Sequence, residues 1–600
     1  MLNISWATDP SSIKYMLLGK NNFFNEKNKN NILQKYLLPI SNAVGTPIAP
    51  LLSVSDLYYP TGKSTVTKKI MKEELEETLE YINTQGIEMV IISDAKYFSH
   101  FTGQKSIEKS VGKVYQCVLP ELGHLDVIPI ISHSAIDMRP EKIKLQEKAL
   151  KAVKSYILGL EIEEDEVFKF NSYKVLQHPR ELQELHKHES LAIDIEATGL
   201  RFERLELVSI SFAWSDHDAV SIAIHRDTQE TNGEHREKLW KEALKDFFLE
   251  YKGKKIFHNA LFDVRALVYH LFMDGLTDHK GRTLGTRTIA DENLDDTMIL
   301  AYLSLNSTSR VKLSLKELAY DFLGDYAEDV TDVLSLPLDD LLVYNSKDTC
   351  GTFWLYNKYN PMVDAEDQRH VYNKVFQPSL NMLTNMMIAG IPLDIDRVKE
   401  VEEELLEIYN NAISKLRGNP LVQLATTQLR MDASEKYNAT HKVKQKTIFE
   451  FGDLVFKPSS PNQVRLLLFD IMGYTAIEKT EAGADKADRA TIEEFLESET
   501  QHDNIEVLES LIEVSKTSIV IKTFLKAFKE YWIERDEGSN IGLLHGNFNI
   551  GKVASGRLSS SSPNLQNLPS GGVMGKLIKS CFPAPKGYVF GGSDFNALTQ

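Results

Sequence analysis

The stretch that decides the fold is Leu191-Ala-Ile-Asp194-Ile-Glu196-Ala-Thr198-Gly-Leu200. Its apolar residues predict a buried β-strand. Because side chains alternate between the two faces of a strand, Asp194 and Glu196 lie on the same face, and their carboxylates converge at the end of the strand. This pair on its own is a weak signal, since surface strands often carry two acids at this spacing.

Two later segments add to the pair: Asn259-Ala-Leu-Phe-Asp263 and Tyr344-Asn-Ser-Lys-Asp348. A spacing of four predicts that Asn259 lies beside Asp263, and Tyr344 beside Asp348, on helix faces. Four carboxylates and one phenol from three distant segments are what two divalent ions need to hydrolyse a phosphodiester. Ligands that are all oxygen favour Mg²⁺ (or Mn²⁺) over zinc, so we expect two such ions as cofactors.

In order and spacing, the three motifs resemble the proofreading 3′→5′ exonuclease superfamily that carries four carboxylates and a tyrosine. The resemblance implies that Asp194, Glu196 and Asp348 hold the first metal ion. It also implies that Asp194 bridges to the second ion and that Asp263 supports that ion.

The resemblance further implies that Tyr344 orients the attacking water, because a neutral phenol is a poor base at pH 7 but a good positioning donor. Thr198 and Asn259 are expected to be supports and not catalysts. His258, beside Asn259, would suggest the branch of the superfamily that uses a histidine, but Tyr344 at the third motif argues against that branch.

The bulk properties predict several soluble domains. The chain has 600 residues, of which 42% are hydrophobic and 26% charged. No apolar run approaches membrane length and the N-terminus lacks a signal-peptide pattern, so we expect no membrane partner. Cys117, Cys350 and Cys581 are far apart and form no CxxC motif, which indicates a reducing compartment. The expected location is cytoplasmic, in the host cytoplasm if the protein is encoded by a phage.

The net charge of −17 is unusual for a protein that handles nucleic acid, but its distribution is uneven. The acidic runs Glu73–Glu80 and Glu161–Glu166 are most simply solvated faces. Residues 545–593 contain no Asp or Glu. This segment, the basic strip, carries Lys552, Arg557, Lys576, Lys579 and Lys586. It predicts a local grip on DNA.

The pattern along the chain predicts three units. Residues 1–165 combine a helix at Lys72–Gln85 with strands at Met89–Asp94 and Val127–Ser132, which indicates a small α/β accessory domain without a chemical motif. Residues 166–360 alternate strands and helices, as in a mixed sheet surrounded by helices, which is a ribonuclease-H-like fold. The elements expected there are strands at Leu207–Trp214 and Ala219–Ile224, and helices at Glu292–Leu303, Leu315–Leu323 and Asp339–Tyr359.

The third unit, residues 361–600, begins with long helical patterns. Helices are expected at Val375–Ala389, Asp396–Lys415 and within Ile492–Tyr531. The polar, weakly patterned segment Gln428–Lys446 is expected to be a loop or flexible insertion. The fold class is therefore α/β and α+β multidomain.

The basic strip contains Ala554-Ser-Gly-Arg557-Leu-Ser-Ser-Ser-Ser-Ser-Pro563-Asn-Leu-Gln566-Asn567-Leu-Pro569. This stretch is similar to the signature that opens the palm of family A DNA polymerases, the family of bacterial DNA polymerase I. The resemblance implies that the helices before it form the thumb. Arg557 is a forked donor suited to sugar-phosphate or the minor groove, and amides can bond bases or backbone. The candidate DNA-binding residues are Arg557, Asn564, Gln566, Asn567 and Lys579.

Gly591-Gly-Ser-Asp594-Phe-Asn596 matches the palm strand whose aspartate holds both polymerase metals. The 600 residues contain neither the fingers helix that binds the triphosphate nor the second palm carboxylate, and Thr599 stands where the family usually has a glutamate. One carboxylate cannot hold two metals, so we expect no DNA synthesis by these residues alone. Deoxynucleoside triphosphates become substrates only if a complementary C-terminal fragment supplies the rest. The chain is read as either an excerpt of a longer protein or a natural split product.

Three functions remain open. The leading one is a phage-type family A DNA polymerase with a proofreading exonuclease, acting on single-stranded and primer-template DNA. The second is a stand-alone RNase D-like exoribonuclease, which the Arg557 signature disfavours. The third is a non-catalytic DNA-binding replication subunit, which the presence of all four carboxylates disfavours. Hydrolysis of single-stranded DNA and RNA with Mg²⁺ separates them.

Overall fold

The computed structural model describes most of the chain. The described residues are 4–20, 29–57, 68–138, 142–161, 168–225, 233–305, 312–324, 332–441, 443–480, 483–535 and 538–593. Asp594 and Thr599 lie outside them, as do most of the acidic run at 161–166. Among the helices in these ranges, none has the length and apolar character needed to span a bilayer.

The N-terminal part of the chain is a six-stranded sheet in the order β1-β3-β2-β4-β6-β5. The four inner strands run parallel, and the short edge strands β1 and β5 are antiparallel to their neighbours. The strands are β1 (Ile4–Ser5), β2 (Tyr15–Lys20), β3 (Leu52–Leu57), β4 (Met89–Ile92), β5 (Tyr115–Gln116) and β6 (Asp126–Pro129).

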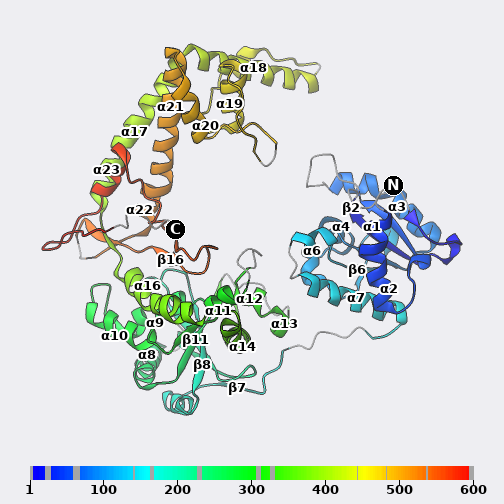
Figure 1. Cartoon of the computed structure of the whole chain (residues 1–600), viewed down its shortest axis with the longest axis horizontal. Coiled ribbons are helices and arrows are strands. Elements are labelled where there is room, and N and C mark those ends of the chain that lie inside the picture. The colour runs from blue at the N-terminus through cyan, green and yellow to red at the C-terminus, as the bar shows by residue number, and fades with distance from the viewer. Residues whose placement is uncertain are drawn as a thin grey trace.

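Helices cover both faces of this sheet (Figure 1). Leu17 packs on one face with helices α2 (Leu38–Val44) and α7 (Ile143–Leu158), whereas its neighbours in β2 pack on the other face. That second face is covered by α3 (Lys68–Gln85) and α4 (Ala95–Thr102). A strand buried on both faces is continuously apolar, and the sequence of β2 and β4 has this character.

A second six-stranded sheet, which we call the central sheet, has the order β12-β11-β8-β9-β10-β7 and is formed by residues 172–296. Strand β8 is central: it runs antiparallel to β9 and parallel to β11. The strands are β7 (Ser172–Val175), β8 (Ser190–Ala197), β9 (Leu207–Ala213), β10 (Asp218–Ala223), β11 (Lys254–Phe257) and β12 (Leu294–Asp296). The helices around it are α8 (Gly233–Glu250), α9 (Ala260–Phe272), α10 (His279–Ile289), α11 (Thr297–Ser304), α12 (Leu315–Leu318), α13 (Tyr320–Leu323) and α14 (Leu338–Ala365).

Two details of this region differ from the sequence prediction. The helix expected at Glu292–Leu303 begins only at Thr297, because residues 294–296 pair with β11 as strand β12. The apolar residues of that short strand match a helical period as well as a strand period. The helix expected at Leu315–Leu323 is interrupted at Ala319, which separates α12 from α13.

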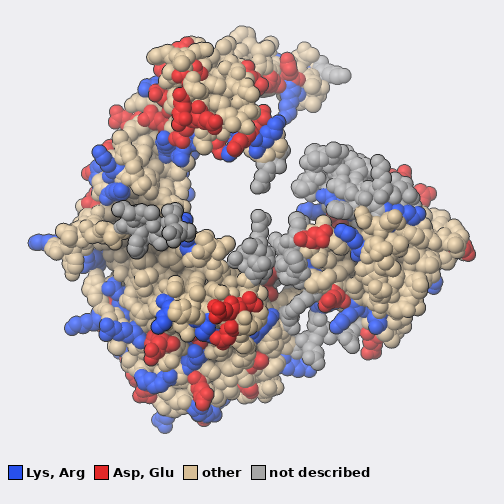
Figure 2. All heavy atoms as spheres, viewed as in Figure 1, with Lys and Arg blue, Asp and Glu red and all other residues tan. Residues whose placement is uncertain are grey.

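Most of the C-terminal part is helical. Helix α14 continues through Pro361 to Ala365, so residue 360 is not an element boundary. The long helices α17 (Ile395–Gly418) and α21 (His502–Ile519) lie side by side and form an arm, the helical arm. In Figure 2, acidic side chains gather over this arm. The other elements are α16 (Gln377–Ala389), β13 (Ile391–Asp394), α18 (Pro420–Thr440), α19 (Pro461–Arg465), α20 (Arg489–Ser498), α22 (Lys526–Tyr531), β14 (Trp532–Glu534), β15 (Ile541–Leu544), β16 (Asn547–Asn549), β17 (Ser559–Ser561) and α23 (Gly572–Ser580).

The loop expected at Gln428–Lys446 is wrong, because α18 covers this segment up to Thr440. Asn419 starts the helix by accepting a hydrogen bond from the backbone N–H of Leu421 at 3.0 Å, and Pro420 follows at the first helical position. The helix buries few residues, so its apolar period is weak. In the sequence, Asn419 and Pro420 mark the start of this helix.

The central sheet and the C-terminal part share one apolar core, to which both Val264 in α9 and Leu383 in α16 belong. Polar bonds also join them: Tyr372 Oη donates to Asp295 Oδ1 at 2.8 Å, and Tyr302 Oη donates to the carbonyl of Val553 at 2.8 Å. Arg265 donates to Asn547 Oδ1 at 2.5 Å. The last two contacts place strand β16 and the connection between β16 and β17 against helices α9 and α11.

Candidate active site

Three carboxylates meet between the central strand and the long helix α14. Asp194 and Glu196 lie on β8, and Asp348 lies on α14, more than 150 residues further along the chain. One oxygen of each lies within 4.8 Å of one oxygen of the others. We call these three residues the acidic cluster. Asp194 and Glu196 lie together as the strand period predicts, and α14 brings Asp348 to the same place.

Asn345 fixes this arrangement from within α14. Its amide nitrogen donates to Asp194 Oδ2 at 2.7 Å, and its amide oxygen accepts a hydrogen bond from the Ser211 hydroxyl on β9. Asn345 is fully buried. It therefore ties α14 to two neighbouring strands at the site. The sequence prediction missed it, although it directly follows Tyr344.

The fourth carboxylate, Asp263, lies on α9 and is 4% exposed. Its Oδ1 accepts a hydrogen bond from the backbone N–H of Ile195, between the two acids of β8, at 3.3 Å. Its charge also raises the pKa of Asp194, so it adjoins the acidic cluster without belonging to the set of mutually close oxygens.

Asp296 anchors the helix that carries Asp263. Its buried carboxylate accepts backbone hydrogen bonds from Asn259 at 3.0 Å, Ala260 at 2.8 Å and Met298 at 2.8 Å, at the starts of α9 and α11. Burial raises its pKa to about 6. The sequence prediction missed this residue, because an acid after a short strand carries no distinct signal.

Asn259 and His258 have structural positions. Asn259 precedes α9 with φ of 63°, so it is not on a helix face beside Asp263 as expected. His258 bonds Thr297 Oγ1 at 2.8 Å and the carbonyl of Leu313 at 2.9 Å, and burial lowers its pKa to about 4. Thr198 accepts a hydrogen bond from the N–H of Glu206 at 2.9 Å and so supports the end of β8.

The acidic cluster carries more negative charge than its surroundings balance. Burial, followed by the charges of Asp263, Glu196 and Asp348, raises the pKa of Asp194 well above its usual range. Burial likewise raises the pKa of Glu196 to about 7 and that of Asp348 well above its ordinary value. Strongly raised carboxyl pKa values at converging oxygens are typical of functional sites. An all-oxygen donor set of this kind fits a hard divalent cation.

Tyr344 lies one turn before Asp348 on α14, as its spacing predicted. The ammonium group of Lys316 donates to Tyr344 Oη at 2.5 Å and lies 4.7 Å from the centre of the ring. Burial raises the pKa of the phenol, so Tyr344 keeps its proton at neutral pH. No sequence signal pointed to Lys316.

The candidate DNA-binding residues lie on and after the β16–β17 hairpin. Arg557, Gln566 and Asn567 are exposed. Asn564 Oδ1 accepts the backbone N–H of Gln566 at 3.1 Å and of Asn567 at 3.2 Å, and Lys579 donates to the carbonyl of Ser570 at 3.0 Å. Two of the five residues therefore fold the strip itself. Asp594 lies outside the described residues.

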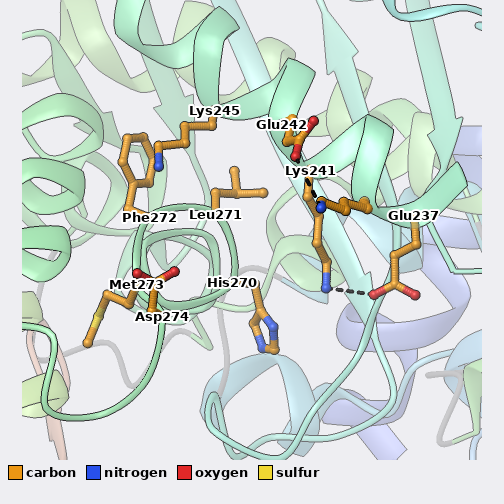
Figure 3. Close-up of a pocket in the computed structure, with 10 residues that line it drawn as sticks. Glu237, Lys241, Glu242, Lys245, His270, Leu271, Phe272, Met273 and Asp274 are labelled. Carbon is orange, nitrogen blue, oxygen red and sulfur yellow. Dashed lines mark ion pairs between the residues drawn. The ribbon is translucent and has the colours of Figure 1, made fainter. Parts of the chain in front are cut away.

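A surface pocket of about 470 Å³ lies between α8 and the end of α9. Its charged side chains are largely paired with one another: Lys241 binds Glu237 at 2.6 Å, and Lys238 lies 4.0 Å from Glu242 (Figure 3). It contains none of the predicted site residues.

Comparisons with known protein families divide the chain into two parts. The family description "3'-5' exonuclease" matches residues 177–364, and "DNA polymerase family A" matches residues 427–598. These two matches are to the families that the sequence predicted, and they agree with the predicted fold class.

The chain is also similar to curated proteins that are named DNA polymerases. The chain is 27% identical over 528 residues to the DNA polymerase of Escherichia phage T5, covering 84% of this chain and 54% of the relative. It is 22% identical over 434 residues to DNA polymerase I of Pseudomonas aeruginosa, covering 70% of this chain and 40% of the relative. The chain thus spans about half the length of these relatives. A solved structure, the POL domain of Pol1 from M. smegmatis in complex with DNA primer-template and dNTP, aligns with 69% of this chain and 59% of that chain at a TM-score of 0.47 and 18% identity.

Proposed function

We propose that this chain removes nucleotides from the 3′ end of DNA by metal-dependent hydrolysis of the phosphodiester bond. The observation that carries the proposal is the acidic cluster, in which oxygens of Asp194, Glu196 and Asp348 lie within 4.8 Å of one another. Its position inside the region that matches the 3′-5′ exonuclease family supports the same conclusion.

The donor set fits Mg²⁺ or Mn²⁺. The converging groups are carboxylates, without cysteine or histidine among them, and their raised pKa values indicate negative charge that a cation would balance. We propose two ions, with Asp194, Glu196 and Asp348 holding the first and Asp194 with Asp263 serving the second. When bound, such ions supply a water of lowered pKa and positive charge at the attacking and leaving oxygens.

The side chains of this site then have distinct tasks. The carboxylates bind and orient, and Asn345 keeps Asp194 at a fixed rotation through the 2.7 Å hydrogen bond. Tyr344 holds a proton at its Oη and offers a hydrogen bond to the attacking water. The bond from Ile195 N–H to Asp263 keeps α9 against β8.

The basic strip is proposed to bind the primer-template. Exposed Arg557 carries five N–H donors in a fork that suits phosphate or a base edge. Gln566 and Asn567 offer exposed amides in the same basic strip. We propose that deoxynucleoside triphosphates are substrates together with a polypeptide that carries a second palm carboxylate and a triphosphate-binding helix. Primer extension by residues 1–600, with and without such a fragment, tests this.

Degradation of end-labelled oligonucleotides tests the exonuclease proposal. With Mg²⁺, 5′-labelled single-stranded DNA should shorten stepwise, whereas 3′-labelled DNA should release mononucleotide first. An RNA oligonucleotide of the same sequence should be degraded much more slowly. Faster loss of RNA than of DNA would favour the RNase D-like function, and no loss of either would reject hydrolysis by this chain.

A further inference from the structure

The ammonium group of Lys316 contacts the phenol of Tyr344 at the acidic cluster. It comes from α12, a short helix whose Leu315 and Leu318 pack into the core around the central sheet. Two apolar anchors on either side of Lys316 fix the helix. The lysine is therefore delivered to the site by packing and not by a free loop.

The contact between the two residues has a defined direction. Lysine is a donor only, so Tyr344 Oη is the acceptor in the 2.5 Å bond. A phenol has one proton, and with its acceptor side facing Lys316 that proton points elsewhere. The position of the ammonium 4.7 Å from the ring centre adds a cation–π attraction that holds the ring as well.

The same ammonium acts on the acidic cluster through space. Its charge lowers the pKa values of Glu196 and Asp348, in opposition to the effect of their burial. A neighbouring cation favours the ionised form of these carboxylates, but it also repels a divalent metal ion. We expect the repulsion to be at least as large as the benefit from ionisation, so removing Lys316 should slow hydrolysis while metal affinity stays equal or rises.

We propose that Lys316 is a positioning residue for hydrolysis, which acts by turning the Tyr344 hydroxyl toward the attacking water. This inference rests on the proposed exonuclease function. It goes beyond that function because it assigns a role to Lys316, which is not one of the four carboxylates or the tyrosine.

Three variants of the 600-residue chain test it. Lys316→Met keeps an unbranched apolar stem and removes the charge, Lys316→Arg keeps the charge, and Lys241→Met is the control. Lys241 pairs with Glu237 in the surface pocket (Figure 3), whose lining contains no residue of the acidic cluster. Turnover and KM on single-stranded DNA and the affinity for Mn²⁺, measured by calorimetry without DNA, are determined for each.

For Lys316→Met, kcat should fall by about 10- to 100-fold, as for the loss of one charged hydrogen bond, with KM nearly unchanged. Its Mn²⁺ affinity should be equal to or higher than that of the wild-type chain. Lys316→Arg should recover most of the turnover, and Lys241→Met should change nothing. A joint loss of turnover and Mn²⁺ affinity would indicate a structural role and overturn the proposal, as would unchanged turnover or failure of arginine to restore it.

A double-mutant cycle identifies the route of the effect. If Lys316 acts through the Tyr344 hydroxyl, then Lys316→Met should cost little more in a Tyr344→Phe background. Full additivity would mean that Lys316 acts on the DNA directly and would reject the positioning role. An inactive wild-type chain would refute the proposed function and this inference together, whereas an active wild-type chain with an equally active Lys316→Met refutes this inference alone.

Discussion

The acidic cluster and the basic strip are built in opposite ways. The acids come from two distant segments, β8 and α14, lie half-buried or buried, and are held by bonds such as that of Asn345 to Asp194. The basic strip is one continuous segment with exposed Arg557. The comparison teaches that the groups proposed for hydrolysis are positioned by the fold, whereas the residues proposed to contact DNA lie along one continuous segment. Damage to one should leave the other largely intact.

The largest effect is expected from Asp194→Asn. The amide keeps the size of the side chain but removes a carboxylate proposed to serve both ions, so degradation of single-stranded DNA should fall by about 10³-fold or more. The variant should also melt at a higher temperature than the wild-type chain without metal, because it relieves repulsion within the acidic cluster. End-labelled DNA and thermal melts measure both.

The matched control for this change is Asp274→Asn, an exposed acid that lines the surface pocket. It should retain wild-type degradation. Activity of Asp194→Asn within tenfold of the wild-type chain would remove Asp194 from the proposed site.

A smaller effect is expected from Tyr344→Phe. Phenylalanine keeps the ring packing on α14 but loses the hydroxyl, so turnover should fall by about 10- to 100-fold. Mn²⁺ affinity should survive, because no carboxylate is changed. If calorimetry showed that metal binding was lost instead, the orienting role of the phenol would be wrong.

Arg557→Ala is expected to affect the other region. Loss of an exposed forked donor should weaken binding to a primer-template by about 3- to 30-fold and reduce the salt dependence of binding by about one ion. Degradation of single-stranded DNA should stay within about twofold of wild type. Fluorescence anisotropy at several salt concentrations checks the first point. An equal loss of hydrolysis would show that the two regions are not separable.

The smallest effect concerns pH. Burial raises the pKa of Glu196 from its usual 4.5 to about 7, so the folded chain without metal binds more protons than the unfolded chain between these values. Its stability should therefore fall as pH rises from 4.5 to 7. Metal ions compete with these protons, so Mg²⁺ should raise the melting temperature by about 2–4 °C more at pH 8 than at pH 5.5. Equal stabilisation at both values would contradict this linkage.

The site was largely predictable, because its residues obey local periods. The strand period paired Asp194 with Glu196, and the helical period placed Tyr344 one turn from Asp348. Lys316 and Asp296 were not predictable in the same way, since their roles depend on which distant backbone or side chain the fold brings near. Asn345 lies within the segment from Tyr344 to Asp348, but its hydrogen bonds to Asp194 and Ser211 depend on strands that the fold brings near.

The predicted secondary structure was right where apolar periods are long, and it was wrong where they are short or sparse. Strand β12 has three residues, so pairing with β11 and not its own pattern decides its conformation. Helix α18 buries few residues, and its Asn419 cap was the better signal. Of these two exceptions, β12 followed tertiary pairing, whereas α18 followed a local helix cap.

The most direct test of the acidic cluster as a metal site is anomalous diffraction from crystals of this chain grown with Mn²⁺. The site described above predicts a manganese ion within about 2.0–2.4 Å of carboxylate oxygens from both β8 and α14. A peak there for the wild-type chain that is lost in Asp194→Asn would confirm it. Manganese bound elsewhere, or contacts to only one of the two segments, would contradict the claim that these distant carboxylates form one site.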